Sequence, residues 1–117
     1  MIYQARAGQV AYGYAIGMLC AEWHIPFIPG DLNNAGTFAF PVRYESVKGV
    51  SGAEVLRGNG ENYAQIMADA AKKLEAEGVR AITGNCGFMA GFQEFVASQV
   101  NIPVFLTSLV QIPMLLN

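Results

Sequence analysis

Apolar residues recur three or four positions apart between Tyr63 and Glu77, and charged residues fill many of the positions between them. This spacing predicts an amphipathic helix over residues 63–77, with Leu74 on its apolar side. Gly78 follows directly, and glycine is the residue that most often ends a helix. The glycine- and asparagine-rich stretch 58–62 breaks the chain before this helix and could cap it.

Short apolar runs alternate with helical patterns after Gly78. Residues 79–83 and 102–106 predict strands, whereas residues 87–100 and 108–116 predict helices. The order helix, strand, helix, strand, helix is typical of a parallel sheet with right-handed crossovers. We therefore expect an α/β fold, a three-layer parallel sheet flanked by helices, that forms a single domain over residues 1–117.

The pattern in the first half of the chain is less decisive. Residues 10–21 are small and apolar and predict a buried strand, with a helix as the alternative because alanine, methionine and leucine favour helices. Residues 26–36 are dense in turn formers and predict a long loop, a feature that is often functional in compact domains. Residues 40–47 predict a short strand in which apolar and charged side chains alternate.

Composition narrows the classes of function. Apolar residues make up 53% of the chain and charged residues only 14%, so either both faces of the sheet are covered or apolar surface meets a partner. The net charge of -2 and the absence of a basic cluster argue against nucleic acid as a partner. The uncharged stretch 7–21 is too short and too glycine-rich for a good membrane span, so we expect no membrane association. Two cysteines make a disulfide framework improbable, and we expect a cytoplasmic protein with reduced thiols.

Cys86 is the strongest candidate for chemistry in this sequence. It lies between the predicted strand 79–83 and the predicted helix 87–100, and ligands of parallel sheets gather where strands end. A helix N-terminus presents unpaired N–H groups and a partial positive charge, an environment that favours a thiolate. Free cysteine is also among the most buried residue types and often acts as a small apolar residue. Position alone leaves both interpretations of Cys86 open.

Other candidates have structural alternatives. Thr107 and Ser108 follow the predicted strand 102–106 at the edge of the sheet that Cys86 shares, and their hydroxyls could bind a carboxylate or cap the next helix. Asp31 could form a turn, cap a helix or contact a ligand. Cys20 lies in an apolar run and His24 in a loop, and we expect both to be structural. No cluster of residues has metal-ligand spacing and no phosphate-loop pattern is present, so we expect no metal and no cofactor.

Several separated motifs along the chain share a recognisable pattern. They are Ile16-Gly17, Pro29-Gly30-Asp31-Leu32-Asn33-Asn34, Phe40-Pro41-Val42-Arg43-Tyr44, Ile82-Thr83-Gly84-Asn85-Cys86-Gly87-Phe88, Pro103-Val104-Phe105-Leu106-Thr107-Ser108-Leu109 and Gln111-Ile112-Pro113. In this order they resemble the aspartate/glutamate racemase family of cofactor-independent racemases, and the similarity covers nearly the whole chain.

The resemblance implies an isomerase with two α/β lobes, in which one cysteine from each lobe acts as acid or base at the α-carbon of a small carboxylate or amino acid. This chain is similar to the N-terminal lobe, and Cys86 matches its catalytic cysteine. Candidate substrate-binding residues are Asn85, Gly87, Thr107, Ser108 and Asp31. No residue matches the cysteine of the second lobe, so we expect a second lobe or a second copy in a homo-oligomer to complete the site. The alternative is a non-catalytic domain that binds small carboxylates.

Overall fold

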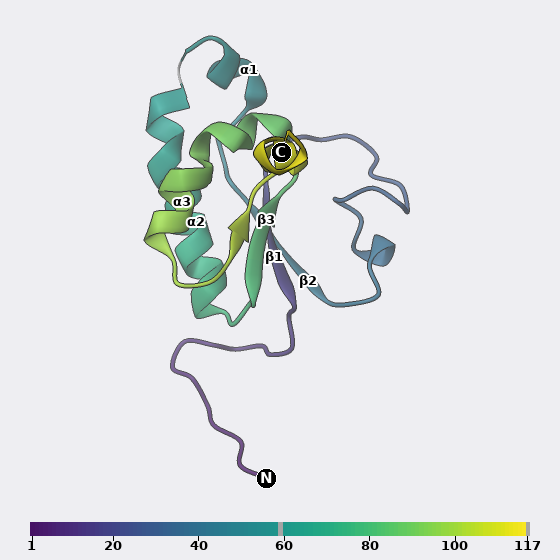
Figure 1. Ribbon diagram of the computed structural model, residues 1–117. Helices are drawn as coiled ribbons and strands as arrows, with labels where there is room; N and C mark the ends of the chain where they lie inside the picture. Colours follow the sequence, from purple (N-terminus) through teal and green to yellow (C-terminus); the bar gives the residue numbers. More distant parts are fainter. Residues whose placement is uncertain (59, 117) are drawn as a thin grey trace.

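The computed structural model describes residues 1–58 and 60–116 (Figure 1). Asn59, part of the predicted break 58–62, lies outside the described residues. The described residues form a small α/β domain around a parallel sheet of four strands in the order β2-β1-β3-β4. The strands are β1 (Ile16–Cys20), β2 (Val42–Ser46), β3 (Ala81–Gly84) and β4 (Val104–Phe105).

Helices α3 and α4 are shorter than the sequence predicts, whereas α2 nearly matches its predicted range. The α-helices are α1 (Gly52–Leu56), α2 (Tyr63–Ala76), α3 (Gln93–Gln99) and α4 (Ile112–Leu115). The described residues also form four short 3-10 helices: η1 (Ala35–Thr37), η2 (Gly60–Asn62), η3 (Gly87–Phe92) and η4 (Ser108–Gln111). No helix of the described part of the chain has the length and apolarity needed to cross a membrane.

The hydrophobic core lies between the sheet and helices α2 and α3. Leu19 of β1 and Ile82 of β3 are buried against Met67, Ala71 and Leu74 of α2. Burying side chains of this size stabilises the fold by about 1.5–3 kcal/mol each. Leu74 lies on the buried side of α2 as predicted, and the other buried residues of this helix are Met67, Ala68 and Ala71.

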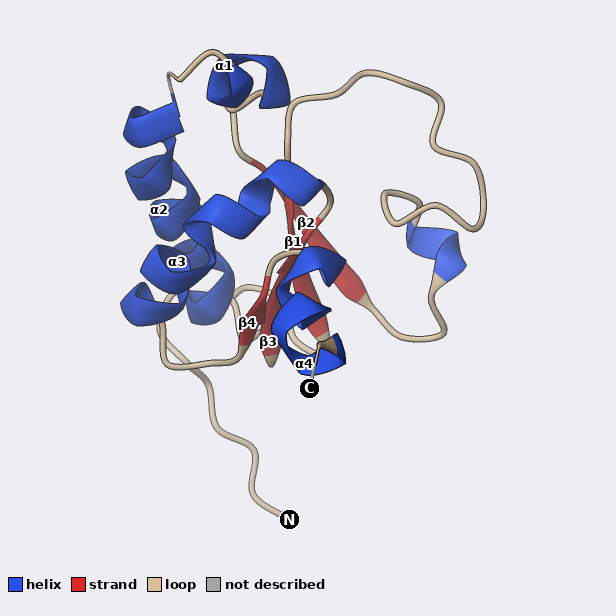
Figure 2. Ribbon diagram, turned by 45° about the horizontal axis from the view of Figure 1, so that its top comes forward, coloured by secondary structure: helices blue, strands red, loops and turns tan. Residues whose placement is uncertain are grey.

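The two faces of the sheet are covered differently. Helices α1, α2 and α3 lie on one side, and the segment between β1 and β2 extends over the other (Figures 1 and 2). This segment includes η1 and is the long loop that the sequence predicted. The Tyr44 hydroxyl of β2 donates a hydrogen bond to the carbonyl of Leu32 in this segment across 2.7 Å. The three-layer prediction is thus met only in its coarser form, a parallel sheet flanked by helices.

Several predicted boundaries were wrong. The strand predicted over 10–21 begins only at Ile16, and the helical alternative is excluded. The helix predicted over 87–100 begins as the 3-10 helix η3 and becomes α-helical only at Gln93. The helix predicted over 108–116 likewise begins as η4. The sequence analysis did not predict α1, whose first turn is capped by the Ser51 side chain.

The order of the strands creates a topological switch point. The chain leaves β1 toward β2 at one edge of the sheet, and it leaves β3 toward β4 at the opposite edge. Because β1 and β3 are neighbours, the segments that follow them separate at their carboxyl ends. Ligands of open α/β sheets bind in the crevice at such a point.

Candidate functional site

Cys86 lies at the switch point, directly after β3 and the residue Asn85. Its backbone is extended (φ -143°, ψ 140°), and its carbonyl accepts a hydrogen bond from the Met89 N–H at 3.1 Å. The thiol is partly exposed. Because the following residues form a 3-10 helix, the α-helix N-terminus that the sequence predicted next to Cys86 is not there.

The Asn85 side chain joins the ends of β1 and β3. Its Oδ1 accepts a hydrogen bond from the Ala21 N–H at 3.0 Å, and its Nδ2 donates to Asn33 Oδ1 at 3.1 Å. Asn33 Nδ2 in turn donates to the Cys20 sulfur at 3.4 Å. Asn85 was predicted to bind substrate, and in this structure its amide fixes the loop that carries Cys86.

Cys20, the second thiol, is buried at the end of β1. Burial raises the pKa of its thiol to about 11, the negative charge of Glu45 adds to this shift, and the Asn33 hydrogen bond opposes it. A thiol with this pKa is neutral near pH 7 and is a poor base or nucleophile. The structural role expected for Cys20 agrees with this environment.

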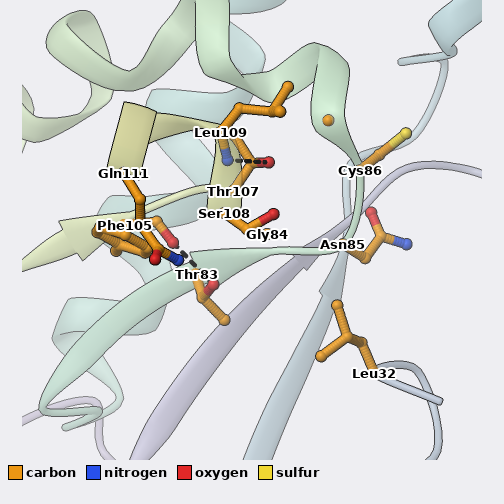
Figure 3. Close-up of a pocket in the computed structure, with 11 residues that line it drawn as sticks. Leu32, Thr83, Gly84, Asn85, Cys86, Phe105, Thr107, Ser108, Leu109 and Gln111 are labelled. Atoms are coloured by element: carbon orange, nitrogen blue, oxygen red, sulfur yellow. Dashed lines mark hydrogen bonds between the residues drawn. The ribbon is translucent and has the colours of Figure 1, made fainter. Parts of the chain in front are cut away.

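One hollow beside Cys86, which we call the hydroxyl hollow, has a volume of about 430 Å³. Thr83, Thr107, Ser108 and Gln111 bring hydroxyl and amide groups to it, and Gly84 and Gly87 also line it (Figure 3). In this view the Cys86 sulfur points away from Thr107 and Ser108.

The threonines of the hydroxyl hollow are held by the backbone. Thr107 is buried and caps η4, because its Oγ1 accepts a hydrogen bond from the Leu109 N–H at 3.3 Å. Thr83 Oγ1 donates to the carbonyl of Phe105 at 2.7 Å. The predicted alternatives for Thr107, a cap and a site residue, are therefore compatible.

A second hollow, which we call the aromatic hollow, has a volume of about 460 Å³. Trp23, Phe27, Asp31 and Cys86 line it, together with Ile25 and the backbone around Gly30. Asp31 is half-buried, and its Oδ1 accepts a hydrogen bond from the Asn33 N–H at 2.8 Å. Asp31 thus forms the turn that the sequence suggested and also faces the hollow.

The charge of Asp31 acts on its surroundings. Burial raises the pKa of Tyr44 above its usual value, and the negative charges of Cys20 and Asp31 add to this shift. The negative charge of the Asp31 carboxylate therefore disfavours a second negative charge in the space next to β1.

The structure brings all predicted site residues to the switch point but divides them between two hollows. Gly87, Thr107 and Ser108 line only the hydroxyl hollow, and Asp31 lines only the aromatic hollow. Asn85 and Cys86 line both. Four further lining residues, Thr83, Gln111, Trp23 and Phe27, were not predicted from the sequence. Phe27 stands inside the turn-rich segment 26–36 and Trp23 three positions before that segment, a signal that could have been used.

Two further observations concern the single histidine and possible metal ligands. His24 is exposed and lines neither hollow. Within residues 1–58 and 60–116, no group of three or more His, Cys, Asp or Glu side chains is arranged to hold a metal ion.

Comparison with known proteins identified relatives named for a lyase. The chain is 33% identical over 100 residues to dimethylsulfoniopropionate lyase 7 of Emiliania huxleyi (strain CCMP1516), a match that covers 85% of this chain and 29% of the relative. It is 33% identical to lyase 6 of the same organism, over 85% of this chain and 26% of the relative. It is 32% identical over 103 residues to dimethylsulfoniopropionate lyase of Durusdinium sp. clade D, over 86% of this chain and 34% of the relative. The chain thus spans about a quarter to a third of the length of these relatives. No family model and no solved structure matches it.

These relatives correct the inference drawn from the motifs. The resemblance to the aspartate/glutamate racemase family was wrong, and so were the racemase activity and the isomerase class that it implied, because the relatives are named for a lyase. The physical reason is that glycines, a cysteine and hydroxyl residues after parallel strands specify a sheet edge with a thiol, and one such edge serves different reactions. The alternative of a non-catalytic carboxylate-binding domain gains no support from these names.

Proposed function

We propose that this chain supplies Cys86 and the two hollows beside it to a lyase that cleaves dimethylsulfoniopropionate. The observation that carries the proposal is the place of Cys86, at the switch point of the sheet and on the boundary of both hollows. The similarity to lyases named for this substrate supports this reaction. The proposal concerns the contribution of this chain, because the match covers only 26% to 34% of the length of these relatives.

The chemistry of the named substrate requires a base. Dimethylsulfoniopropionate joins a dimethylsulfonium cation to a propionate carboxylate. When a base removes a proton from the carbon next to the carboxylate, a carbon–carbon double bond forms and the carbon–sulfur bond breaks. The sulfur leaves with the electron pair of that bond as neutral dimethyl sulfide, and acrylate remains. The proton stays on the base.

Cys86 is suited to act as this base. In its thiolate form it accepts one proton and becomes a neutral thiol, which balances the reaction. A general base must lie within hydrogen-bond reach of the proton it removes. A ligand that extends from one hollow into the other places its central carbon atoms next to Cys86, which lines both. Cys20 is not suited, because its raised pKa keeps it protonated.

The hydroxyl hollow is suited to the carboxylate. Thr107 and Ser108 offer hydroxyl groups, and Gln111 offers an amide. The Ser108 hydroxyl makes no hydrogen bond to other described residues and is free to donate to a ligand. Hydrogen bonds to a charged group contribute about 1.5–3 kcal/mol each, so two or three such donors hold a carboxylate without a cationic side chain.

Incubation of the folded chain with dimethylsulfoniopropionate tests the proposal. We expect release of dimethyl sulfide and acrylate in equal amounts, measured by gas chromatography and NMR. Substitution Cys86→Ala should lower the rate at least about 100-fold, the usual minimum for loss of a general base. The matched control Cys20→Ala removes the other thiol and should retain the rate.

Protection of Cys86 tests binding separately from turnover. We expect dimethylsulfoniopropionate to slow alkylation of Cys86 by iodoacetamide, as followed by mass spectrometry. If the folded chain shows neither turnover nor protection of Cys86, or if Cys86→Ala retains the rate of product release, the proposal is overturned.

A further inference from the structure

We propose that the aromatic hollow binds the trialkyl cation of the ligand, with Trp23 supplying an aromatic face and Asp31 a countercharge. The inference rests on the proposed function, because it concerns the sulfonium end of the same substrate. It also makes a claim that the proposed function does not need, namely that this chain selects a cation over an uncharged group of the same shape.

The first observation is the charge of the hollow. In the described residues, the ion pairs use Arg43, Arg57 and Lys73, and none of these cations contacts Asp31. One oxygen of the Asp31 carboxylate accepts the Asn33 N–H. The carboxylate is half-buried on the wall of a hollow without a cationic partner among the described residues, so a bound cation would not have to displace a cationic side chain.

The second observation is the state of the Trp23 ring. Trp23 lines the hollow and is nevertheless 51% exposed. The ring pairs of the described residues are Phe38 with Phe40 and Phe88 with Phe92, so no aromatic neighbour covers the indole. Tryptophan is the aromatic residue that attracts a cation best, and sulfonium and quaternary ammonium groups lack the N–H donors that a carboxylate alone would select.

The third observation is the contrast between the two hollows. The hydroxyl hollow contains uncharged donors and no carboxylate, whereas the aromatic hollow contains Asp31 and two aromatic rings. A ligand with one cationic and one anionic end is therefore bound in a single orientation. Its anionic end avoids Asp31, its cationic end contacts Trp23, and its middle passes Cys86.

Binding of three ligands distinguishes recognition of the positive charge from recognition of the shape. Dimethylsulfoniopropionate and 3-(trimethylammonio)propionate carry the cation, and 4-methylpentanoate has an uncharged carbon in place of the sulfur. Trp23 is the single tryptophan of the chain, so intrinsic fluorescence reports on this hollow alone. We expect both cations to change the emission and to bind roughly tenfold more tightly than 4-methylpentanoate, within the range of cation–aromatic attraction.

Two variants test the named residues. Asp31→Asn retains an oxygen that can accept the Asn33 N–H, so the turn is preserved while the charge is removed. It should lower the affinity for the cations and leave that for 4-methylpentanoate unchanged. Trp23→Leu should likewise lower the affinity for the cations and leave that for 4-methylpentanoate unchanged, as measured by calorimetry. Trp23→Phe should retain part of the preference for the cations. The control Glu94→Gln removes an exposed carboxylate on α3, outside both hollows, and should change nothing.

The results distinguish this inference from the proposed function. Cys86-dependent release of dimethyl sulfide without a preference for the cations would overturn only the inference. A preference for the cations that Asp31→Asn abolishes, without turnover, would support the inference and count against the proposed reaction. Equal binding of charged and uncharged ligands, or equal losses for both in the Asp31 and Trp23 variants, would overturn the inference.

Discussion

The side-chain oxygen of Asn85 accepts a hydrogen bond from the backbone N–H of Ala21 at 3.0 Å, although 64 positions separate these residues in the sequence. Ala21 is buried, so its N–H has no access to water. The bond joins the segments that leave β1 and β3 in opposite directions. It therefore links the two sides of the switch point at the residue that directly precedes Cys86.

Substitution Asn85→Ala should destabilise the protein by about 1–3 kcal/mol, because it leaves the buried Ala21 N–H without an acceptor. Urea unfolding followed by circular dichroism measures the change. The control Asn101→Ala removes an exposed amide whose side chain forms none of the hydrogen bonds described here, and its midpoint should stay within experimental error. Equal midpoints for the two variants would show that Asn85 does not fix these segments.

The two thiols should differ in reactivity. Cys20 is buried and has a pKa of about 11, so only about one Cys20 side chain in a thousand is ionised at pH 8, whereas Cys86 is partly exposed on two hollows. We expect iodoacetamide to label the native chain once, at Cys86, as located by peptide mass spectrometry. In urea both cysteines should react. Labelling of both at equal rates in the native chain would contradict the buried environment of Cys20.

Cys20 should also make stability fall at high pH. Its pKa is about 11 in the folded protein and 9.0 in the unfolded chain, so folding favours the protonated thiol. The protonated Cys20 thiol contributes about 1–3 kcal/mol to the free energy of unfolding. This contribution is complete below pH 9, decreases as the pH rises from 9 to 11, and is lost above pH 11. The variant Cys20→Ser preserves the shape and does not titrate in this range. Urea unfolding at pH 8, 9, 10 and 11 should therefore give a smaller decrease for the variant than for the parent chain.

Local patterns were sufficient to predict much of the sheet. The alternation of strand and helix after residue 63 gave the parallel β3 and β4 and the crossover helices, because each element there is bounded by a glycine or a proline. The position of Cys86 at the carboxyl end of β3 followed from the same pattern. These strands, helices and the position of Cys86 depend on residues that are close together in the sequence, so one sequence is enough to predict them.

Features set by distant contacts could not be predicted. The hydrogen bonds of Asn85 reach Ala21 and Asn33 in other segments, so its positioning role could not be deduced from its neighbours in the sequence. The aromatic hollow forms only because the segment after β1 folds back toward Cys86 and brings Trp23 and Phe27 with it. The reaction class was missed for a different reason, since the motifs specify the sheet edge and the thiol but not the bond that breaks.

Gly84 is the last residue of β3, and the structure leaves no room there for a side chain. A Cβ atom at this position would lie 2.7 Å from the backbone carbonyl oxygen of Leu106 and would also collide with the sulfur of Met89. The carbonyl of Leu106 cannot move without shifting Thr107, which follows it and lines the hydroxyl hollow. Gly84 thus allows β3 and the segment after β4 to approach closely enough to form that hollow.

Substitution Gly84→Ala should therefore destabilise the protein by about 1–3 kcal/mol, the usual cost of overpacking, and should shift the amide NMR signals of Thr107 and its neighbours. Gly91→Ala is the matched control, because a Cβ there would have no heavy atom within 4 Å and its backbone has no positive φ. That variant should be as stable as the parent chain or slightly more stable, by up to about 1 kcal/mol. If both variants unfold at the same urea concentration, the close contact between Gly84 and Leu106 does not support the hydroxyl hollow, and the carboxylate site loses its structural basis.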